Sequence, residues 1–203
     1  MFSVDRPVRR LAQLYAGLVL YGASMALQIR AGLGLDPWDV FHQGVADRAG
    51  LTFGTVVIIT GAAVLLAWVP LRQRPGIGTI SNVFVIGVTV DVSLALVPAA
   101  GSSAAALVML LAGIGLNGVA SGAYIGAGLG PGPRDGLMTG LVRRTGGSVR
   151  VVRTTIEVAV LVVGAVLGGT VGLGTVLYAV SIGPLVHVLL PRLTVAQAAA
   201  APA

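Results

Sequence analysis

The sequence is poor in charge and has no cysteine. Only 10% of its 203 residues are charged, whereas an ordinary soluble domain has about 25%; 56% are hydrophobic, and the mean hydropathy is +0.95. A soluble fold of this length would need a polar surface that this composition cannot supply. The lack of cysteine excludes disulfides, thiolate metal sites and thiol redox chemistry. The composition therefore indicates an integral membrane protein.

Lysine is missing as well, so every one of the 13 basic residues is arginine, against 7 acidic residues. A basic balance can indicate nucleic-acid binding. Here, however, the arginines stand singly or in pairs between apolar runs, as the positive-inside bias of membrane proteins produces. We therefore expect a lipid bilayer, and no nucleic acid, as the partner of this chain.

The sequence patterns of familiar enzymes are also missing. There is no Walker loop, HExxH motif or catalytic triad. The pattern Gly113-x-Gly115-x-x-Gly118 matches a dinucleotide fingerprint, but it lies inside an apolar run with no preceding strand, so its context is wrong. His42 with scattered aspartates makes no metal site, and we expect it at the surface. The sequence predicts no cofactor, no metal and no enzymatic activity.

What the chain does contain is a duplication. The segment 32–39, GLGLDPWD, recurs at 128–135 as GLGPGPRD, an offset of 96 residues (128 − 32 = 96). The same offset relates matching residues without a gap from Leu14 to Gly183. The chain is therefore an internal duplication, and the repeated Gly-Pro-Asp motif lies at its centre.

Apolar runs divide each repeat into three predicted spans. They cover 11–29, 52–71 and 77–97 in repeat 1 (11–98), and 104–127, 149–167 and 173–190 in repeat 2 (104–191). Most of these runs approach the 20 residues that a helix needs to cross a bilayer. A basic arm, 1–10, precedes the first run, which is longer than the core of a signal peptide. We expect an all-α polytopic membrane protein with about six transmembrane helices and a disordered tail over 192–203.

Arginine placement predicts the orientation of these spans. If the basic arm is cytoplasmic, then Arg72, Arg74, the arginines between 134 and 150, and Arg192 also face the cytoplasm. Both termini are then cytoplasmic, in the plasma membrane. Because each repeat has three spans, the two repeats enter the membrane in opposite orientations, which is the inverted-topology arrangement of many transporters.

Each motif copy begins a short predicted helix. Asp36 suits the N-cap position and Pro37 the first helical position, whereas Gly132 replaces the aspartate in the second copy. The segment 37–48 would be about 18 Å long as a helix, half a membrane. It either lies on the interface or re-enters the membrane with its positive N-terminus near the midplane. The predicted motif backbone comprises Gly32, Gly34, Pro37, Gly128, Gly130 and Pro133.

Charged side chains inside spans are the other candidates, because each costs about 2.5–3.5 kcal/mol there without a partner or cavity. Arg153 and Glu157 form an i,i+4 pair, either a structural clamp or a substrate or proton site. Asp91 and His187 occupy equivalent positions in the two repeats and can reach headgroups or a pathway. The predicted substrate or ion pathway comprises Asp39, Asp135, Arg134, Arg153, Glu157, Asp91 and His187.

These features resemble a known family. The motif GLGLDPWD, the downstream Gly-x-Gly-Thr at 76–79, and the pattern Arg150-x-x-Arg153-Thr-Thr-x-Glu157 are similar to the bacterial YczE/YyaS/YitT membrane proteins over roughly residues 11–191. The resemblance implies a polytopic plasma-membrane protein of a largely uncharacterised family in which transport is suspected. The second motif copy departs from the first at Gly132 and Arg134, so a site formed by both copies would be asymmetric.

The sequence favours a small transporter or channel-like permease for an unknown solute or ion, with its site between the repeats. The alternative is a scaffold or regulator that binds a partner protein through its glycine-rich helix faces. An intramembrane enzyme is a third class, but no convincing nucleophile and base are present. So small a six-span protein can work as a homodimer, although the sequence does not choose its oligomeric state.

Overall fold

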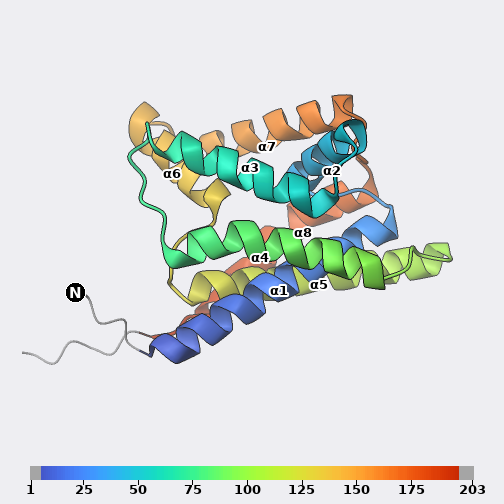
Figure 1. The fold of residues 1–203 in the computed structure, drawn as a ribbon, viewed down its shortest axis with the longest axis horizontal. Coiled ribbons are helices and arrows are strands. Elements are labelled where there is room, and N and C mark those ends of the chain that lie inside the picture. The colour runs from blue at the N-terminus through green and yellow to red at the C-terminus, as the bar shows by residue number, and fades with distance from the viewer. Residues whose placement is uncertain (1–5, 197–203) are drawn as a thin grey trace, which may run out of the picture.

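The computed structural model describes residues 6–196, and all regular structure in that range is helical (Figure 1). The first five residues of the basic arm and the tail from residue 197 lie outside the described range. The eight described helices are α1 (Pro7–Ala31), α2 (Pro37–Ala49), α3 (Phe53–Trp68), α4 (Ile77–Leu96), α5 (Ser103–Gly126), α6 (Pro133–Thr145), α7 (Val149–Val166) and α8 (Leu173–Leu193). The predicted all-α class is confirmed, and the two motif helices are α2 and α6.

The ends of the motif helices follow from their cap residues. The Asp36 carboxylate accepts hydrogen bonds from the backbone N–H groups of Trp38 (2.9 Å) and Asp39 (3.2 Å), as expected for an N-cap. Gly132, its counterpart in α6, supplies no side-chain cap. Both helices end at a glycine with positive φ, Gly50 in α2 and Gly146 in α6. The predicted difference between the two motif copies is therefore confirmed.

Four of the described helices, α1, α4, α5 and α8, are long and apolar enough to cross a membrane. The pair α2 and α3, bent by 115° at its short break, makes a fifth span if it is counted as one. The described helix α3 has only 16 residues, and α7 carries Arg150, Arg153 and Glu157. The protein is thus a multi-pass membrane protein. Four described helices, or five spans with the bent pair, have clear spanning character, and six spans stay a prediction.

Antiparallel packing of α1 on α5 forms the centre of the fold. A Cβ added to Gly17 would lie 2.8 Å from the backbone nitrogen of Tyr124, and one added to Gly113 would lie 2.7 Å from Cγ of Gln28. The two contacts are equivalent under the 96-residue offset, because Gly17 corresponds to Gly113 and Gln28 corresponds to Tyr124. Small residues of this kind let helix backbones approach closely in lipid, where no hydrophobic force drives them together. The remaining long helices pack outside this pair, α4 against α1 and α8 against α5.

The Gly-x-Gly-Thr segments explain the glycines of the motif. The N–H of Gly78 donates to the carbonyl of Leu129 (2.8 Å), and the N–H of Gly174 donates to the carbonyl of Leu33 (2.7 Å). Each repeat therefore holds the motif loop of the other. Positive φ occurs at two equivalent glycines of each motif loop, which are Gly32 (66°) and Gly34 (108°) in the first and Gly128 (67°) and Gly130 (129°) in the second.

The short helices lie at opposite ends of the molecule, α2 at the right and α6 at the left in Figure 1. α2 packs on α7, and α6 packs on α3. The Arg10 guanidinium donates to the carbonyls of Ala127 (2.8 Å) and Val195 (3.1 Å). It thereby joins the start of α1 to the ends of α5 and α8, so the two ends of the described chain lie together, at the same end of the molecule as α6 (Figure 1).

Candidate functional site

All eight described helices contribute to one central cavity of about 310 Å³, and the N-termini of α2 and α6 both face it. The volume falls at the lower end of the range for small-ligand pockets, about 300–1,000 Å³. Residues Asp36 to Trp38 enter it from one side, and Gly132 to Asp135 enter it from the other. Segments that are 96 residues apart in sequence therefore meet at one place.

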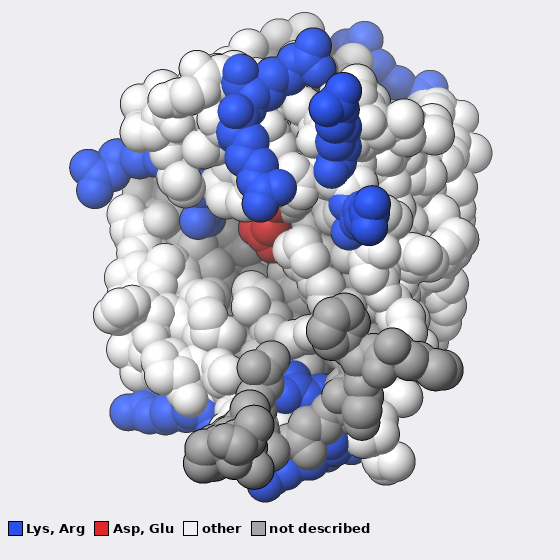
Figure 2. Space-filling view, turned by 90° about the vertical axis from the view of Figure 1, so that its left-hand side faces the viewer, with Lys and Arg blue, Asp and Glu red and all other residues white. Residues whose placement is uncertain are grey.

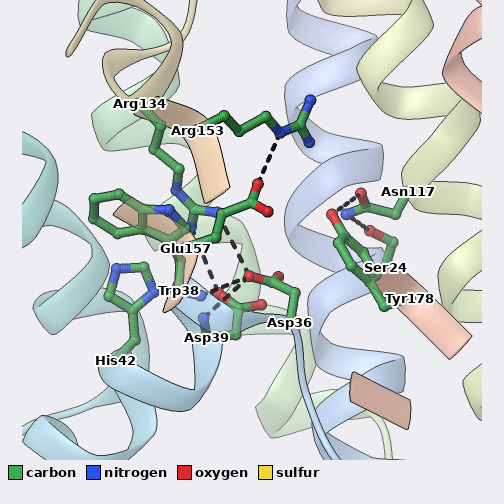
Figure 3. Close-up of polar contacts among 10 residues, drawn as sticks. All are labelled: Ser24, Asp36, Trp38, Asp39, His42, Asn117, Arg134, Arg153, Glu157 and Tyr178. Carbon is green, nitrogen blue, oxygen red and sulfur yellow. Dashed lines mark hydrogen bonds and ion pairs between the residues drawn. The ribbon is translucent and has the colours of Figure 1, made fainter. Parts of the chain in front are cut away.

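The two motif copies touch each other through Arg134 (Figure 3). Its guanidinium lies 3.6 Å from the Asp36 carboxylate and 3.7 Å from that of Asp39. It also lies over the Trp38 ring, 4.8 Å from the centroid, as in a cation–π contact. Trp38 and Arg134 are equivalent residues of the two repeats. A basic side chain of the second copy thus occupies an acidic and aromatic pocket formed by the first.

His42 extends this cluster to the interior of α2. Its Nδ1 lies 3.1 Å from the Asp39 carboxylate, and its side chain is 3% exposed. The rings of Trp38, Phe41 and Phe53 surround it at centroid distances of 5.8–6.4 Å. The prediction of a surface histidine is therefore wrong, because α2 is enclosed by α3 and α7 rather than presenting that face to water.

Two further acidic side chains line the cavity. The Arg153 guanidinium donates to the Glu157 carboxylate at 2.9 Å, so the predicted i,i+4 pair is formed. Asp135 accepts a hydrogen bond from the Tyr124 hydroxyl at 3.3 Å. No basic side chain among residues 6–196 lies within ion-pairing distance of Asp135. The cavity and its acidic wall thus hold four carboxylates (Asp36, Asp39, Asp135 and Glu157) and two guanidinium groups (Arg134 and Arg153).

The cavity is closed on the side of α2 and open on the side of α6. The side chains of Asp36 and Asp39 are 3% and 2% exposed, whereas Arg134 is 32% and Glu157 is 39% exposed. Viewed from the left of Figure 1, arginines frame a hollow that has acidic side chains at its floor (Figure 2). Solutes at this face of the molecule can therefore reach the charged residues.

Two predicted pathway residues lie elsewhere. Asp91 accepts hydrogen bonds from the hydroxyl of Thr52 (2.5 Å) and the backbone N–H of Gly54 (2.7 Å), which places it at the start of α3. His187 is exposed on α8 and does not line the cavity. The two positions are equivalent in sequence, but the structure shows a role only for Asp91, whose carboxylate accepts hydrogen bonds at the N-terminus of α3.

Sequence reasoning missed the tyrosines of the site. Tyr21, Tyr124 and Tyr178 line the cavity from α1, α5 and α8. Behind them, the Tyr178 hydroxyl donates to Asn117 (3.0 Å), whose amide donates to Ser24 (2.9 Å). Their position in the middle of apolar runs could have indicated them, because a buried polar group in lipid needs a hydrogen-bonding partner.

The site offers binding chemistry. No group of three or more histidine, aspartate or glutamate side chains in the described part of the chain could hold a metal ion. What the described residues provide is a set of ion pairs, aromatic rings and hydroxyls around an open cavity. Such an arrangement can recognise a small polar or charged solute.

Comparison with known proteins reveals the family. Residues 8–191 match a family of unknown function, DUF6198. The chain is 38% identical to an uncharacterized protein of Haemophilus influenzae over 87% of this chain and 81% of that protein. It is 35% identical to the uncharacterized membrane protein YczE of Bacillus subtilis (88% and 84% covered) and 26% identical to YyaS of the same organism (86% and 89%). No solved structure matches. The chain therefore belongs to the DUF6198 family, and its similarity to YczE and YyaS confirms the predicted resemblance.

Proposed function

We propose that this protein is a small transporter or channel-like permease of the bacterial plasma membrane, with a solute site between two inverted repeats. The observation that carries the proposal is the meeting of both motif copies at one cavity, where Arg134 of the second copy binds Asp36 and Asp39 of the first. Transporter folds of this kind often bind their substrates where broken helices meet near the midplane.

The inverted arrangement is supported by the equivalent contacts. α1 and α5 occupy equivalent positions in the two repeats and run antiparallel, and each repeat holds the motif loop of the other through a backbone hydrogen bond. In this proposal α2 and α6 are re-entrant half-helices, which favours one of the two interpretations left open by the sequence. Irregular backbone at the membrane centre is tolerated there because it is buried in protein or lines the cavity.

The orientation of the protein is part of the same proposal. The two ends of the described chain, helix α6 and the arginine-framed hollow lie at one end of the molecule (Figures 1 and 2). The positive-inside rule assigns that end to the cytoplasm. The cavity would then be open to the cytoplasm and closed towards the outside, which is one of the two states that alternating access requires.

Accessibility of the cavity from both faces tests this function without knowledge of the solute. Thr60 lines the cavity on α3, and the chain has no native cysteine, so Thr60→Cys introduces a single, nearly isosteric thiol. A permeation pathway predicts that a small, charged, membrane-impermeant thiol reagent modifies this cysteine when added from either face. Reaction from one face only, at every time and temperature tested, would contradict a pathway and favour a scaffold.

Flux gives the second measurement. Proteoliposomes should be assayed for uptake of guanidinium, acetate and glycerol, which represent a cationic, an anionic and a neutral solute. We expect the solute that crosses to lose most of its flux in the Asp135→Asn, Glu157→Gln variant. Unchanged flux in that variant would contradict the assignment of the site.

A further inference from the structure

The charge balance of the cavity indicates the class of solute. Four carboxyl groups face two guanidinium groups, so acidic side chains outnumber basic ones at this site. Charges at the arginine-framed mouth are solvated and screened over about 8 Å at physiological ionic strength. Charges deeper in the cavity are screened much less. The interior, rather than the mouth, therefore decides which charge binds favourably.

The first motif copy shows how the site holds a cation. The guanidinium of Arg134 lies between two carboxylates, Asp36 and Asp39, and over the aromatic face of Trp38. This is the arrangement by which proteins recognise organic cations, with carboxylates for the charge and a ring for the flat or alkylated surface. The Arg134 guanidinium therefore occupies this pocket in the way that a bound organic cation would.

The second motif copy has the acidic residue and the rings but a different partner. Asp135 is the equivalent of Asp39, and the Tyr124 hydroxyl is its described side-chain partner. Tyr124 contacts Tyr21 edge to face with a centroid distance of 6.1 Å, and Tyr178 lines the same cavity. The carboxylate of Asp135 therefore faces an aromatic wall, with the Arg153–Glu157 pair on the neighbouring helix.

We infer that the cavity binds a small organic monocation, of guanidinium or alkylammonium type, with Asp135 as its charge partner and Tyr124 and neighbouring tyrosines as its aromatic wall. This inference rests on the proposed function and specifies the substrate class of the same site. An anion would instead have to approach four carboxylates to reach Arg134 or Arg153, each of which already has an acidic partner.

Binding to the purified full chain in detergent tests the inference. Trp38 is one of only two tryptophans and lines the cavity, so its fluorescence reports directly on the site. Guanidinium and ethylammonium should be titrated against acetate and glycerol at constant ionic strength. We expect saturable changes with the two cations alone. Saturation by acetate or glycerol in place of the cations would overturn the inference.

Three variants locate the binding. Asp135→Asn keeps the shape of the side chain and removes its charge, and we expect cation affinity to fall about tenfold or more, as for loss of a charge-assisted hydrogen bond. Asp47→Asn is the matched control, because Asp47 is exposed and lies outside the cavity lining. Tyr124→Phe keeps the carboxylate and removes its hydrogen-bond donor, so we expect equal or tighter binding. Equal loss in the Asp47 and Asp135 variants would overturn the inference.

The binding and flux measurements together distinguish the proposal of transport from the proposal of an organic-cation substrate. Cation binding without passage of any thiol reagent or solute through the protein would support the substrate class and contradict transport. Flux of acetate or glycerol without cation binding would support transport and contradict the substrate class. Thermal unfolding of each variant in the same detergent establishes that a lost fluorescence change comes from the site and not from unfolding. If Asp135→Asn does not fold, Tyr124→Phe gives a second measurement of cation affinity.

Discussion

The two motif helices begin with related sequences but are packed differently. Position 164 on α7 and position 68 on α3 are equivalent, yet one is glycine and the other tryptophan. A Cβ at Gly164 would lie 2.4 Å from the backbone nitrogen of Phe41, so α2 lies directly on the α7 backbone. On the other side the Trp68 ring fills the space beside Gly136 of α6. The α2 side is sealed by backbone contact, whereas the Trp68 side chain lies between α3 and α6 on the other side.

This difference separates a closed end from an open end. α2 keeps Asp36 and Asp39 almost fully buried, whereas α6 leaves Arg134 one-third exposed to the hollow. Because one equivalent position is glycine and the other is tryptophan, the two ends of the cavity cannot be packed identically. Four pairs of substitutions test how much of the asymmetry each contact maintains.

The largest effect is expected at Trp68. Its ring is 2% exposed, and its Nε1–H donates to the carbonyl of Pro133 at 3.0 Å. Trp68→Ala would leave a cavity beside Gly136 and remove the hydrogen bond to the Pro133 carbonyl, so we expect a loss of about 3–5 kcal/mol in the free energy of unfolding. The free energy of unfolding is measured by titration with a denaturing detergent. Trp68→Phe should recover most of the packing and lose only the hydrogen bond; an equal loss in both variants would contradict this account.

Gly164→Ala should have the next largest effect. The added methyl would meet the backbone of Val40 and Phe41, which cannot move aside as a side chain can, and overpacking of this kind costs about 1–3 kcal/mol. Gly183→Ala on α8 is the matched control, because a Cβ there meets nothing. We expect a lower melting temperature for the first variant and an unchanged or higher one for the second. Similar melting temperatures would show that α2 does not depend on close approach.

The N-cap of α2 is expected to have a smaller effect. Asp36→Ala removes the two cap hydrogen bonds and one carboxylate from the Arg134 pair, and loss of a cap costs about 0.5–2 kcal/mol. Asp36→Asn is the matched variant, because it retains a capping oxygen and loses only the charge. We expect the asparagine variant to be the more stable of the two in the same unfolding assay, and the reverse order would contradict the capping role.

The smallest effect concerns two equivalent arginines. Arg48 donates to the carbonyls of Leu167 (3.1 Å) and Val166 (3.0 Å) at the end of α7, whereas Arg144 donates only to Pro70 (3.1 Å) beyond the end of α3. Both side chains are exposed, so each hydrogen bond contributes about 0.5–1.5 kcal/mol at most. Arg48→Ala should lower the melting temperature slightly more than Arg144→Ala does. A larger loss at Arg144 would contradict the tighter closure of the α2 end.

Much of the fold could be predicted because the lipid environment simplifies the sequence. Apolar runs, arginine pairs and the 96-residue offset located all the helices within a few residues, and cap chemistry located the start of α2 at Pro37. The spacing of Arg153 and Glu157 predicted their pair, because an i,i+4 contact depends only on helical geometry.

The tertiary contacts of the site could not be predicted in the same way. In membrane helices that are apolar all round, hydrophobic periodicity does not reveal the buried face. No sequence pattern therefore indicated that Tyr21 and Tyr178 point inward. The enclosure of His42 was not indicated either. Contact between Arg134 and Trp38 depends on how α2 and α6 pack in three dimensions, which the sequence left open. These two positions are equivalent in the duplication, and the sequence alone did not show that they lie next to each other in the fold.

The central claim is that two motif helices reach one cavity from opposite faces of the membrane. Asp47 near the end of α2 and Arg143 near the end of α6 are equivalent, exposed positions, and the chain has no native cysteine. Asp47→Cys and Arg143→Cys variants in intact cells should be treated with a membrane-impermeant maleimide. The account predicts that Asp47→Cys is labelled directly and that Arg143→Cys is labelled only after the cells are permeabilised. Labelling of both cysteines from the same side would contradict it.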